Sequence, residues 1–419
     1  MKTVCVMGLG YIGLPTASIL ATNGCQVLGV DVDPRVVERV NAGNIHIGEP
    51  GLHTIVQAAV CSGNLRAELE PEKADIYIIA VPTPLTDEKK ADLSYVCKAA
   101  EQITALIEPG GLVILESTSP PGTCRDLLRP ILEQSGLKVG KDIYLAHCPE
   151  RVLPGKILRE LVGNDRVIGG YTERCAQRAR DLYAIFVEGE IFLTDVTTAE
   201  MAKITENAFR DVNIAMANET ALLCEALGID FWEMARLASR HPRVNVHNAG
   251  PGVGGHCISV DPWFLVEKFP EQAQLIRLAR ERNDRMPRHV VENTLALLPG
   301  IEQPRIAALG LAYKGNVDDM RESPSLAVVD MLKEAGAQVA VHDPYVRSTA
   351  LDLSSFEECF HGAHCILLLT DHTDYRYVNP RQVAKLVQKQ VLFDTRNFLD
   401  HADWTAAGFE VHVLGRSSA

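Results

Sequence analysis

The chain has 419 residues, of which 47% are hydrophobic, and a formal net charge of −13. We expect two or three globular domains at this length. The acidic balance argues against a protein that binds nucleic acid or an anionic membrane surface. No apolar run reaches the roughly 18–20 residues that a membrane-spanning helix needs. The N-terminus leads directly into a predicted strand, so we also expect no signal peptide.

The eleven cysteines are scattered along the chain and include no Cys-x-x-Cys pair. An odd number without a regular framework is typical of reduced thiols, so we expect a cytoplasmic protein. The histidines and cysteines also lack the spacing of a structural metal site, and we expect no metal.

A β-branched and apolar run at the N-terminus enters the motif Gly8-x-Gly10-x-x-Gly13. A helix is predicted from about Leu14 to Asn23, and a second strand covers Gln26–Asp31 and ends in an acid. Strand, glycine turn, helix, strand and acid in this order form the fingerprint of a dinucleotide-binding unit.

Each residue of that fingerprint would have a physical role. Gly8 would make the tight turn, Gly10 would admit the pyrophosphate, and Gly13 would let the helix pack on the strand. The helix N-terminus would then face the phosphates. Asp31 would accept hydrogen bonds from the adenosine ribose, which favours NAD over NADP. The alternative is a glycine turn without a ligand.

Further strands are predicted at residues 74–81, 111–116, 142–146 and 166–169, with helices between them. This alternation predicts a doubly wound α/β domain. Ligands of open α/β sheets bind at the carboxyl ends of the strands, where Thr83, Thr118 and Glu150 are found. The two hydroxyls could equally cap helices, and Glu150 is either a general base or a solvated loop acid.

A long helix is predicted from Thr198 to Leu227, where Gly228 ends it. Lys203, Asn207 and Arg210 fall on one narrow arc of this helix. The arc is either a solvated face or a surface for an anionic or oxyanionic ligand. The residues expected to face a core lie on a separate arc and are Met201, Ile204, Ala208, Val212 and Ala215.

The segment Pro251–Pro262 places Cys257 directly after a glycine-rich loop and four residues before Asp261. A thiol at such a loop can be a nucleophile if its thiolate is stabilised. The alternative is a turn followed by a buried cysteine that acts as a small hydrophobic residue. The upstream segment 240–245 contributes two arginines and a histidine, a local positive charge that would favour the thiolate and bind phosphate.

A second helical region, about 270–298, ends at Pro299-Gly300, where we expect a domain boundary. Strands predicted at 305–311, 338–342, 365–370 and 391–394 complete a second α/β unit. This unit lacks a Gly-x-Gly-x-x-Gly motif, so we expect no second NAD site. Tyr313, Lys314 and Arg321 suggest recognition of a ring and phosphates, and the alternative is a surface loop of salt bridges with the neighbouring acids.

Taken together, these motifs resemble the UDP-glucose/GDP-mannose dehydrogenase family along the whole chain. The segments that carry the resemblance are 8–15, 81–84, 116–122, 148–151, 200–210 and 254–261. Segments 151–155, 209–215 and 240–245 look like the branch that oxidises UDP-N-acetyl-D-mannosamine at C6 for bacterial surface polysaccharides. UDP-N-acetyl-D-glucosamine, which is the C2 epimer, and UDP-glucose stay open as substrates. A non-catalytic sensor of NAD and a nucleotide sugar is the remote alternative.

The resemblance implies a three-part α/β architecture. Residues 1–195 would form a Rossmann-type NAD domain, and residues 196–300 a central long-helix region with the cysteine loop and a dimer surface. Residues 301–419 would form a Rossmann-like domain that binds the UDP-sugar. The expected assembly is a homodimer.

The resemblance also implies a four-electron oxidation of a sugar C6 alcohol to a carboxylate, with two NAD as oxidants. Cys257 would trap the intermediate aldehyde as a thiohemiacetal, and a second oxidation would leave a thioester for water to hydrolyse. Lys203 matches the family's acid/base or oxyanion-stabilising lysine, and Asn207 matches the amide beside it. The remaining catalytic matches are Asp261, Glu150 and Thr118.

The binding residues carried over from the family form two sets. Cofactor contacts are expected at Gly8, Gly10, Tyr11, Ile12, Gly13, Asp31, Thr83, Thr118 and Arg321. Substrate contacts are expected at Arg151, Val152, Lys203, Asn207, Arg210, His241, Arg243, Gly254, Tyr313 and Lys314. The glycines before Cys257 are interpreted as space for the sugar beside the thiol.

Overall fold

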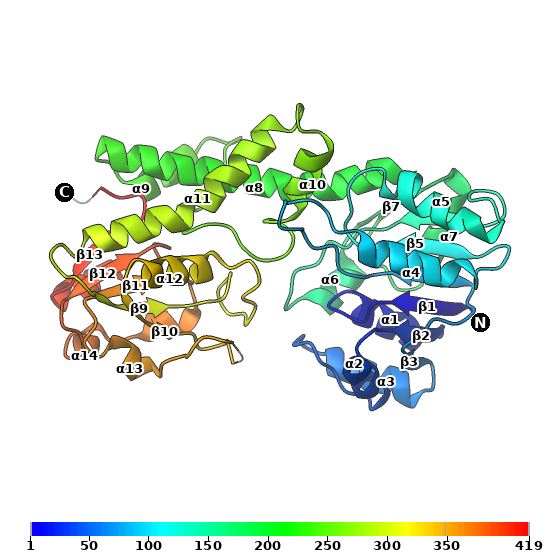
Figure 1. Cartoon of the computed structure of the whole chain (residues 1–419), viewed down its shortest axis with the longest axis horizontal. Helices are drawn as coiled ribbons and strands as arrows, with labels where there is room; N and C mark the ends of the chain where they lie inside the picture. Colours follow the sequence, from blue (N-terminus) through cyan, green and yellow to red (C-terminus); the bar gives the residue numbers. More distant parts are fainter. Residues whose placement is uncertain (1, 348, 418–419) are drawn as a thin grey trace. The chain divides into compact units, whose positions relative to one another are not determined.

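The computed structural model describes residues 2–347 and 349–417 (Figure 1). The chain forms two compact units. Unit 1 comprises Met1–Glu206 and Trp263–Lys268, and unit 2 comprises Asn207–Pro262 and Phe269–Ala419. Both units contain a sheet with helices, which confirms the predicted α/β class. The three-part division at residues 195/196 and 300/301 stays a prediction.

Unit 1 is built on one sheet with the strand order β3-β2-β1-β4-β5-β6-β7-β8. The strands are β1 (Thr3–Met7), β2 (Gln26–Val30), β3 (Leu65–Glu68), β4 (Ile76–Ile79), β5 (Leu112–Leu115), β6 (Tyr144–His147), β7 (Arg166–Gly170) and β8 (Ile191–Asp195). All pairs from β3 to β6 are parallel, whereas β7 is antiparallel to β6. The strand order reverses between β1 and β4, which is where α/β sheets bind ligands.

The helices of unit 1 connect these strands. They are α1 (Gly13–Thr22), α2 (Pro34–Asn41), α3 (Leu52–Cys61), α4 (Ser94–Thr104), α5 (Arg129–Leu132), α6 (Ile157–Gly163) and α7 (Glu173–Tyr183), with short η1 (Cys124–Leu128) and η2 (Glu133–Ser135) turns around α5. Asp33 and Thr172 cap α2 and α7 by accepting hydrogen bonds from backbone N–H groups of the first turn.

Unit 2 contains a parallel sheet with the strand order β10-β9-β11-β12-β13. Its strands are β9 (Arg305–Leu309), β10 (Gln338–His342), β11 (Cys365–Leu368), β12 (Val391–Asp394) and β13 (Glu410–Val413). Its helices include α9 (Phe231–Ala238), α11 (Gln274–Ala296), α12 (Pro324–Glu334), α13 (Phe356–Phe360), η3 (Thr373–Tyr377), α14 (Pro380–Val383) and α15 (His401–Ala406). The helix α10 (Asp261–Lys268) begins in unit 2 and ends in unit 1.

The strands β3, β8 and β13 were not predicted from the sequence, and each of them lies at an edge of its sheet. An edge strand is covered on fewer sides than a central strand, so its sequence need not form a continuous apolar run. In β3, for example, buried and exposed residues alternate. The central strands β4, β5, β6 and β11 are buried at every position, and each was predicted.

The helix α8 (Val196–Leu227) is the predicted long helix, and it ends at Gly228, whose φ is +72°. Ile204, Ala208 and Ala215 are buried as expected. Met201 is 41% exposed, so its predicted place in the core is wrong. At about 100° per residue, Met201 lies at the margin of the buried face, beside the side of the helix that is exposed.

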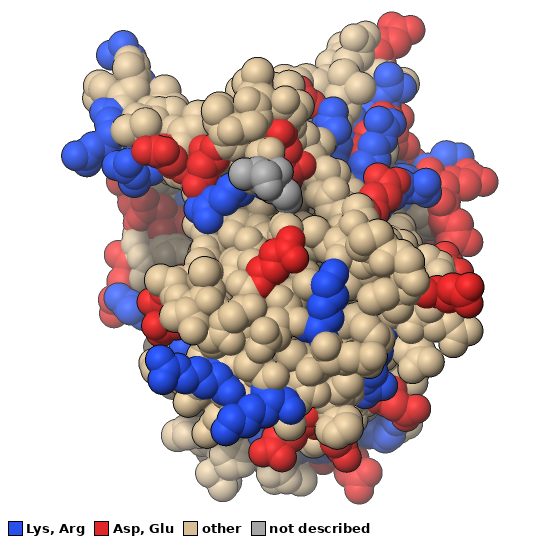
Figure 2. Space-filling model, turned by 90° about the vertical axis from the view of Figure 1, so that its left-hand side faces the viewer, with Lys and Arg blue, Asp and Glu red and all other residues tan. Residues whose placement is uncertain are grey.

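The molecular surface seen in Figure 2 carries lysine and arginine side chains interspersed with aspartate and glutamate. Neither sign of charge covers this face continuously. Among the helices that the structure describes, none combines the length and the apolar character needed to cross a membrane.

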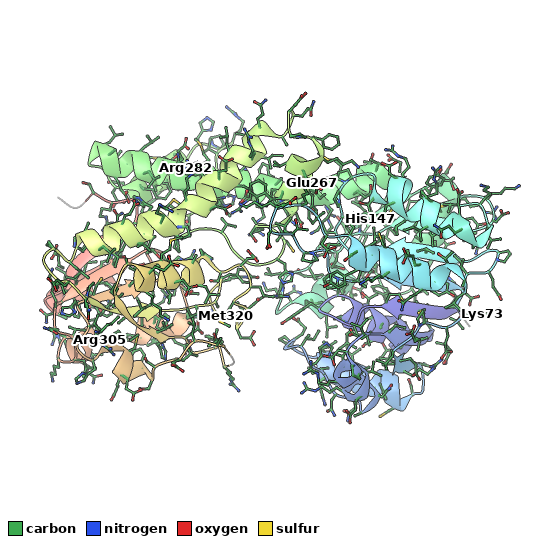
Figure 3. The ribbon with its side chains drawn as sticks, in the orientation of Figure 1. Lys73, His147, Glu267, Arg282, Arg305 and Met320 are labelled. Carbon is green, nitrogen blue, oxygen red and sulfur yellow. The ribbon has the colours of Figure 1, made fainter. Side chains whose placement is uncertain are left out.

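Arginine side chains also hold elements together within unit 2. Arg305, at the start of β9, donates from Nε to the carbonyl oxygen of His361 at 2.8 Å (Figure 3). His361 directly follows α13, so this bond fixes the end of α13 against the sheet. A helix of five residues needs such support, because short helices are marginal without tertiary contacts.

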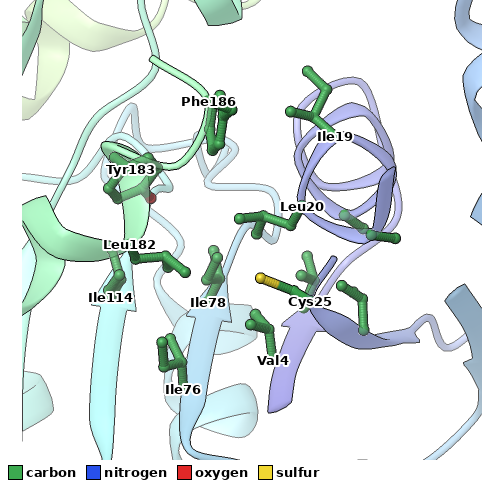
Figure 4. Close-up of a cluster of buried hydrophobic side chains, with 14 of the residues drawn as sticks. Val4, Ile19, Leu20, Cys25, Ile76, Ile78, Ile114, Leu182, Tyr183 and Phe186 are labelled. Atoms are coloured by element: carbon green, nitrogen blue, oxygen red, sulfur yellow. The ribbon is translucent and has the colours of Figure 1, made fainter. Parts of the chain in front are cut away.

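The core of unit 1 lies between its sheet and the helices α1 and α7 (Figure 4). Val4 of β1 and Ile78 of β4 face Leu20 of α1 and Leu182 of α7, and all four side chains are at most 1% exposed. The opposite face of the same sheet is buried against α4 and the segment 124–132. This packing holds the carboxyl ends of β1, β4, β5 and β6 in place for the loops that follow them.

Candidate active site

The turn after β1 has the geometry that a dinucleotide requires. Gly8 has a φ of +94°, and its N–H donates to the Val30 carbonyl at 2.7 Å. A side chain at Gly13 would overlap the Gly8 carbonyl oxygen, so α1 can approach the turn only with glycine there. By contrast, a Cβ at Gly10 would meet no atom of the described residues within 4 Å. Open space at Gly10 fits a pyrophosphate close to the backbone.

Asp31 follows β2 and faces this turn. Its carboxylate accepts hydrogen bonds from the Leu9 and Asp33 N–H groups, each at 3.0 Å. Two backbone donors therefore fix the acid that would bind the adenosine ribose. Tyr11 and Ile12 lie half-buried between Gly10 and α1. The residues present thus fit NAD at this end of the sheet.

The loops after β4 and β5 are tied to each other. The Thr83 hydroxyl donates to the Thr118 carbonyl oxygen at 2.8 Å, and the Ser117 hydroxyl donates to the Val81 carbonyl oxygen at 2.7 Å. Neither threonine caps a helix, because α4 has Leu93 at its N-cap and the η1 turn follows Thr123. The two predicted site threonines are therefore neighbours, and the capping alternative does not apply to them.

Glu200 of α8 holds the loop that follows Thr118, a role that the sequence analysis missed. Its carboxylate is fully buried and accepts hydrogen bonds from the N–H groups of Gly122 and of Cys124, the latter at 2.8 Å. Charge-assisted bonds of this kind are stronger than neutral ones. The only sequence signal was that Glu200 lies in a family motif, which gives no partner.

Glu150 follows β6 and is 9% exposed, so it is not a solvated loop acid. Its Oε2 lies 3.3 Å from Nη2 of Arg166 in β7, and its Oε1 accepts from the Arg151 N–H at 2.5 Å. Arg151 in turn pairs with Glu206 through Nε at 3.1 Å. The adjacent Val152 is half-buried against the core.

A second carboxyl group shares the environment of Arg166. Glu116 is 2% exposed and accepts a hydrogen bond from the Tyr183 hydroxyl at 2.5 Å. Burial raises the pKa of Glu116 from its ordinary 4.5 to about 7, and the charge of Arg166 acts in the opposite direction. The buried Arg166 guanidinium thus lies near two carboxyl groups, and Glu116 takes up a proton near pH 7.

His147, at the end of β6, is fully buried (Figure 3). Burial lowers the pKa of His147 to about 3, and the positive charge of Lys203 acts in the same direction. The imidazole is therefore neutral at physiological pH. Lys203 itself is only 8% exposed. A buried lysine does not belong to a solvated helix face, so the ligand-facing alternative fits Lys203 better.

Asn207, one helical turn after Lys203, is also 8% exposed. Its Nδ2 donates to Oδ2 of Asp261 at 2.6 Å, and Asp261 is 3% exposed. The structure therefore brings together two residues that the family motifs predicted separately. Arg210, which the sequence put on the same arc, is exposed.

Cys257 is exposed, whereas most of the other cysteines are buried. Its carbonyl oxygen accepts the N–H groups of Val260 at 3.2 Å and of Asp261 at 2.8 Å. These two bonds form a helical turn that leads from Cys257 into α10. The reading of Cys257 as a buried hydrophobic residue is therefore wrong, because this turn presents its thiol at the surface.

The glycines before Cys257 have neighbours within the protein. A Cβ at Gly255 would lie 2.7 Å from the Tyr313 ring, and a side chain at Gly254 would overlap the Glu322 carbonyl oxygen. Gly255 also has a φ of +89° and donates its N–H to the Arg321 carbonyl at 3.0 Å. The structure fills this space with Tyr313 and the segment 321–322, so this packing alone requires both glycines.

Arg321 forms a two-pronged ion pair with Asp319, at 2.8 Å from Nε and 2.7 Å from Nη2. Arg321 therefore forms a salt bridge with a neighbouring acid, as the alternative interpretation of this loop expected. Lys314, His241 and Arg243 are exposed. The binding roles of these residues stay predictions.

Unit 2 has a turn like that after β1, but the acid beside this turn, Asp343, is bound by another side chain of the protein. Gly310 has a φ of +95°, and Asp343 accepts the Leu311 N–H at 2.7 Å, as Asp31 accepts that of Leu9. However, His372 lies 3.0 Å from Asp343 through Nε2. The Asn316 N–H donates to Nδ1 of His372, so Nε2 carries the proton and donates to Asp343. The Asp343 carboxylate is therefore already hydrogen-bonded to a side chain of the protein.

The described residues contain no cluster of three or more histidine, cysteine, aspartate or glutamate side chains that could hold a metal ion.

The sequence matches three parts of the UDP-glucose/GDP-mannose dehydrogenase family. The NAD binding domain matches residues 2–187, the central domain residues 197–285, and the UDP binding domain residues 307–401.

Individual proteins are similar over nearly their whole length. A UDP-N-acetyl-D-mannosamine dehydrogenase of Methanococcus maripaludis is 48% identical, over 100% of this chain and 98% of the relative. An NDP-N-acetyl-D-galactosaminuronic acid dehydrogenase of Ralstonia nicotianae is 47% identical, over 94% and 96%. The solved structure of a UDP-D-ManNAc dehydrogenase from Pyrococcus horikoshii has a TM-score of 0.94 and 41% identity, with 100% of both chains covered.

The Glu116 carboxyl makes stability depend on pH in a defined direction. In the folded protein Glu116 keeps its proton up to about pH 7, but in the unfolded chain only up to its ordinary pKa of 4.5. Its contribution to stability is therefore complete below pH 4.5 and is lost as the pH rises through 7. Glu116→Gln, which is neutral in both states, should lack this dependence.

We expect the free energy of unfolding of the wild type, relative to Glu116→Gln, to fall by roughly 3 kcal/mol across this window. Urea unfolding of both proteins at several pH values between about 4 and 8 measures this difference. A difference that does not vary with pH would show that Arg166 keeps Glu116 ionised throughout.

Proposed function

Because the chain belongs to the UDP-glucose/GDP-mannose dehydrogenase family, we propose that it oxidises the C6 hydroxyl of UDP-N-acetyl-D-mannosamine to the carboxylate. The family assignment made from the motifs is confirmed, and the protein is an NAD-dependent UDP-sugar dehydrogenase. The observation that carries the covalent mechanism is the exposed Cys257 thiol, one helical turn from the buried Asn207–Asp261 pair.

NAD is held by the turn after β1 in this proposal. Gly8, Gly10 and Gly13 keep the backbone free of side chains, and Asp31 binds the adenosine ribose. Bound NAD supplies the hydride acceptor for each of the two oxidations. Tyr11, Ile12, Thr83, Thr118 and Arg321 are the further cofactor contacts that we propose.

The Cys257 sulfur acts as the nucleophile between the two oxidations. Its thiolate attacks the C6 aldehyde carbon, an S–C bond forms, and the carbonyl oxygen takes up a proton to give a thiohemiacetal. Loss of the C6 hydrogen with its electron pair and of the hydroxyl proton leaves a thioester. Water then attacks the thioester carbon, the S–C bond breaks, and the thiol is restored as the carboxylate leaves.

Buried polar groups support these steps. Lys203 stabilises the negative charge that develops on the oxygen at C6. The side-chain amide of Asn207 donates a hydrogen bond to Asp261 and so holds this carboxylate in place. Asp261 and Glu150 take up protons and orient water, and Thr118 lines the site. For the UDP-sugar itself we propose contacts from Arg151, Val152, Arg210, His241, Arg243, Gly254, Tyr313 and Lys314, because cationic side chains suit a diphosphate.

The choice of sugar rests on the relatives. Those with the mannosamine name reach 49% identity, and the Pyrococcus structure has the same name. The Ralstonia relative, at 47% identity, makes an N-acetyl-D-galactosamine nucleotide a second candidate. We propose a cytoplasmic enzyme whose product, a UDP-linked aminosugar acid, is a precursor of surface polysaccharide.

We further propose that the enzyme is a homodimer in which two copies of α8 meet. Phe209, Met216 and Leu223 follow one another at intervals of seven residues and are 64%, 66% and 57% exposed. Leu227, on the same side of the helix, is 72% exposed. A row of large apolar side chains at this spacing is typical of a helix that packs on a partner helix.

Turnover of four UDP-sugars at matched concentrations tests the substrate assignment. The candidates are UDP-N-acetyl-D-mannosamine, its glucosamine and galactosamine analogues, and UDP-glucose, with NADH absorbance as the readout. We expect kcat/KM for the mannosamine sugar to exceed the others by ~10-fold or more. The glucosamine sugar differs in the direction of its C2 substituent, the galactosamine sugar differs at C2 and C4, and glucose has no N-acetyl group. Faster oxidation of any of the other three would refute the choice of sugar.

Met216→Asp tests the dimer, because a charge in the apolar row must be desolvated when two copies of α8 meet. We expect the variant to sediment as a monomer at concentrations where the wild type is a dimer. Tyr377→Asp changes an apolar side chain of unit 2 that is 82% exposed but lies outside α8, so it should remain dimeric. A dimeric Met216→Asp protein would place the interface elsewhere.

A further inference from the structure

The segment that carries Cys257 has little regular structure of its own. Between the end of α9 at Ala238 and the start of α10 at Asp261, the described residues form turns and bends but no helix or strand. A nucleophile must be held within a fraction of an ångström of a productive position. Contacts with other parts of the protein must therefore hold this segment in position.

Arg280 of α11 reaches the segment directly. The side chain is fully buried, and its Nη1 donates to the Ile258 carbonyl oxygen at 3.3 Å. Ile258 is the residue next to Cys257. The same guanidinium is held by two carboxylates, through Nη1 to Asp211 of α8 and through Nη2 to Asp284 of α11 at 2.6 Å.

The other end of the segment is tied to the same buried cluster. The Gly250 N–H donates to Oδ1 of Asn218 at 2.9 Å. Asn218 donates to Oδ1 of Asn283 at 2.9 Å, and Asn283 donates to Oδ1 of Asp211 at 2.8 Å. A continuous chain of hydrogen bonds therefore runs from Gly250 through Asp211 and Arg280 to the residue that follows Cys257.

A buried arginine is a costly way to stabilise a fold. Well-packed apolar residues often stabilise a protein as well or better, because the desolvation of two charges offsets their attraction. Arginine does offer a rigid fork of donors that can bind two carboxylates and a carbonyl oxygen in fixed directions. That geometry suits a group whose task is to fix a backbone position.

We propose that Arg280 is a positioning residue for Cys257. It holds the Ile258 carbonyl against α8 and α11 and so sets the position of the thiol one residue earlier. The inference rests on the proposed nucleophilic role of Cys257 for its effect on catalysis. The effect on the position of the thiol does not depend on which substrate the enzyme uses.

Arg280→Lys tests the proposal, with Arg282→Lys as the matched control. Lysine keeps the charge but cannot bind two carboxylates and a carbonyl together. Arg282 lies two residues away on α11, is partly exposed, and pairs with Glu219 at 3.0 Å (Figure 3). Asp284→Asn is a milder second variant, because it removes one of the two carboxylates from a site that is partly exposed.

Four quantities are measured on each full-length protein. They are the rate of Cys257 alkylation by iodoacetamide without ligands, kcat, KM for NAD, and the melting temperature. We expect Arg280→Lys to change the alkylation rate several-fold and to lower kcat by ~10-fold or more, with KM for NAD nearly unchanged. Asp284→Asn should shift both in the same direction by less, and Arg282→Lys should match the wild type.

Each outcome has a distinct meaning. If Arg280→Lys and Asp284→Asn lower the melting temperature but leave alkylation and kcat at wild-type values, Arg280 is only structural and the proposal is overturned. If Arg280→Lys does not fold, an unchanged alkylation rate in Asp284→Asn overturns it. Altered alkylation in a protein that oxidises none of the UDP-sugars would support the positioning role and refute the proposed function instead.

Discussion

The hydrogen bond from Asn207 to Asp261 is the interaction on which the candidate site most depends. It joins the long helix α8 to the first residue of α10, and both partners are nearly inaccessible to solvent. Cys257 lies one turn before Asp261, and its carbonyl oxygen accepts the Asp261 N–H. A shift of Asp261 would therefore move the thiol, and a charge this deeply buried is costly unless it keeps its partner.

Each of the two units contains a buried arginine that lies near two carboxyl groups. In unit 1 the buried Arg166 serves Glu150 and Glu116, and in unit 2 the buried Arg280 serves Asp211 and Asp284. Each arginine lies beside a segment with a proposed catalytic residue. Because a carboxylate without its partner would be strongly destabilised, such clusters tolerate few arrangements of the backbone. A backbone held in one arrangement keeps the proposed catalytic side chains in position, as a reaction with several proton transfers requires.

The sequence predicted the central strands, the glycine turn and α8, because continuous apolar runs and glycine spacing depend on local structure alone. It missed the edge strands β3, β8 and β13, which lack full burial. It also missed the partners of Glu116 and Glu200, and the contact of Arg280 with Ile258. These pairs are far apart in the chain, so no local pattern records them. Gly254 and Gly255 were interpreted as space for the sugar, and the packing of Tyr313 against them was not predicted.

In the proposed mechanism, a covalent bond to Cys257 carries the sugar from aldehyde to acid. Counting the NADH formed per UDP-N-acetyl-D-mannosamine, with enzyme and NAD in excess, tests this role of Cys257. The wild type should form two NADH and one sugar acid. Cys257→Ser should form at most one NADH and no acid, since its hydroxyl is a much weaker nucleophile than a thiolate. Two NADH and wild-type amounts of acid from Cys257→Ser would rule out covalent catalysis by Cys257.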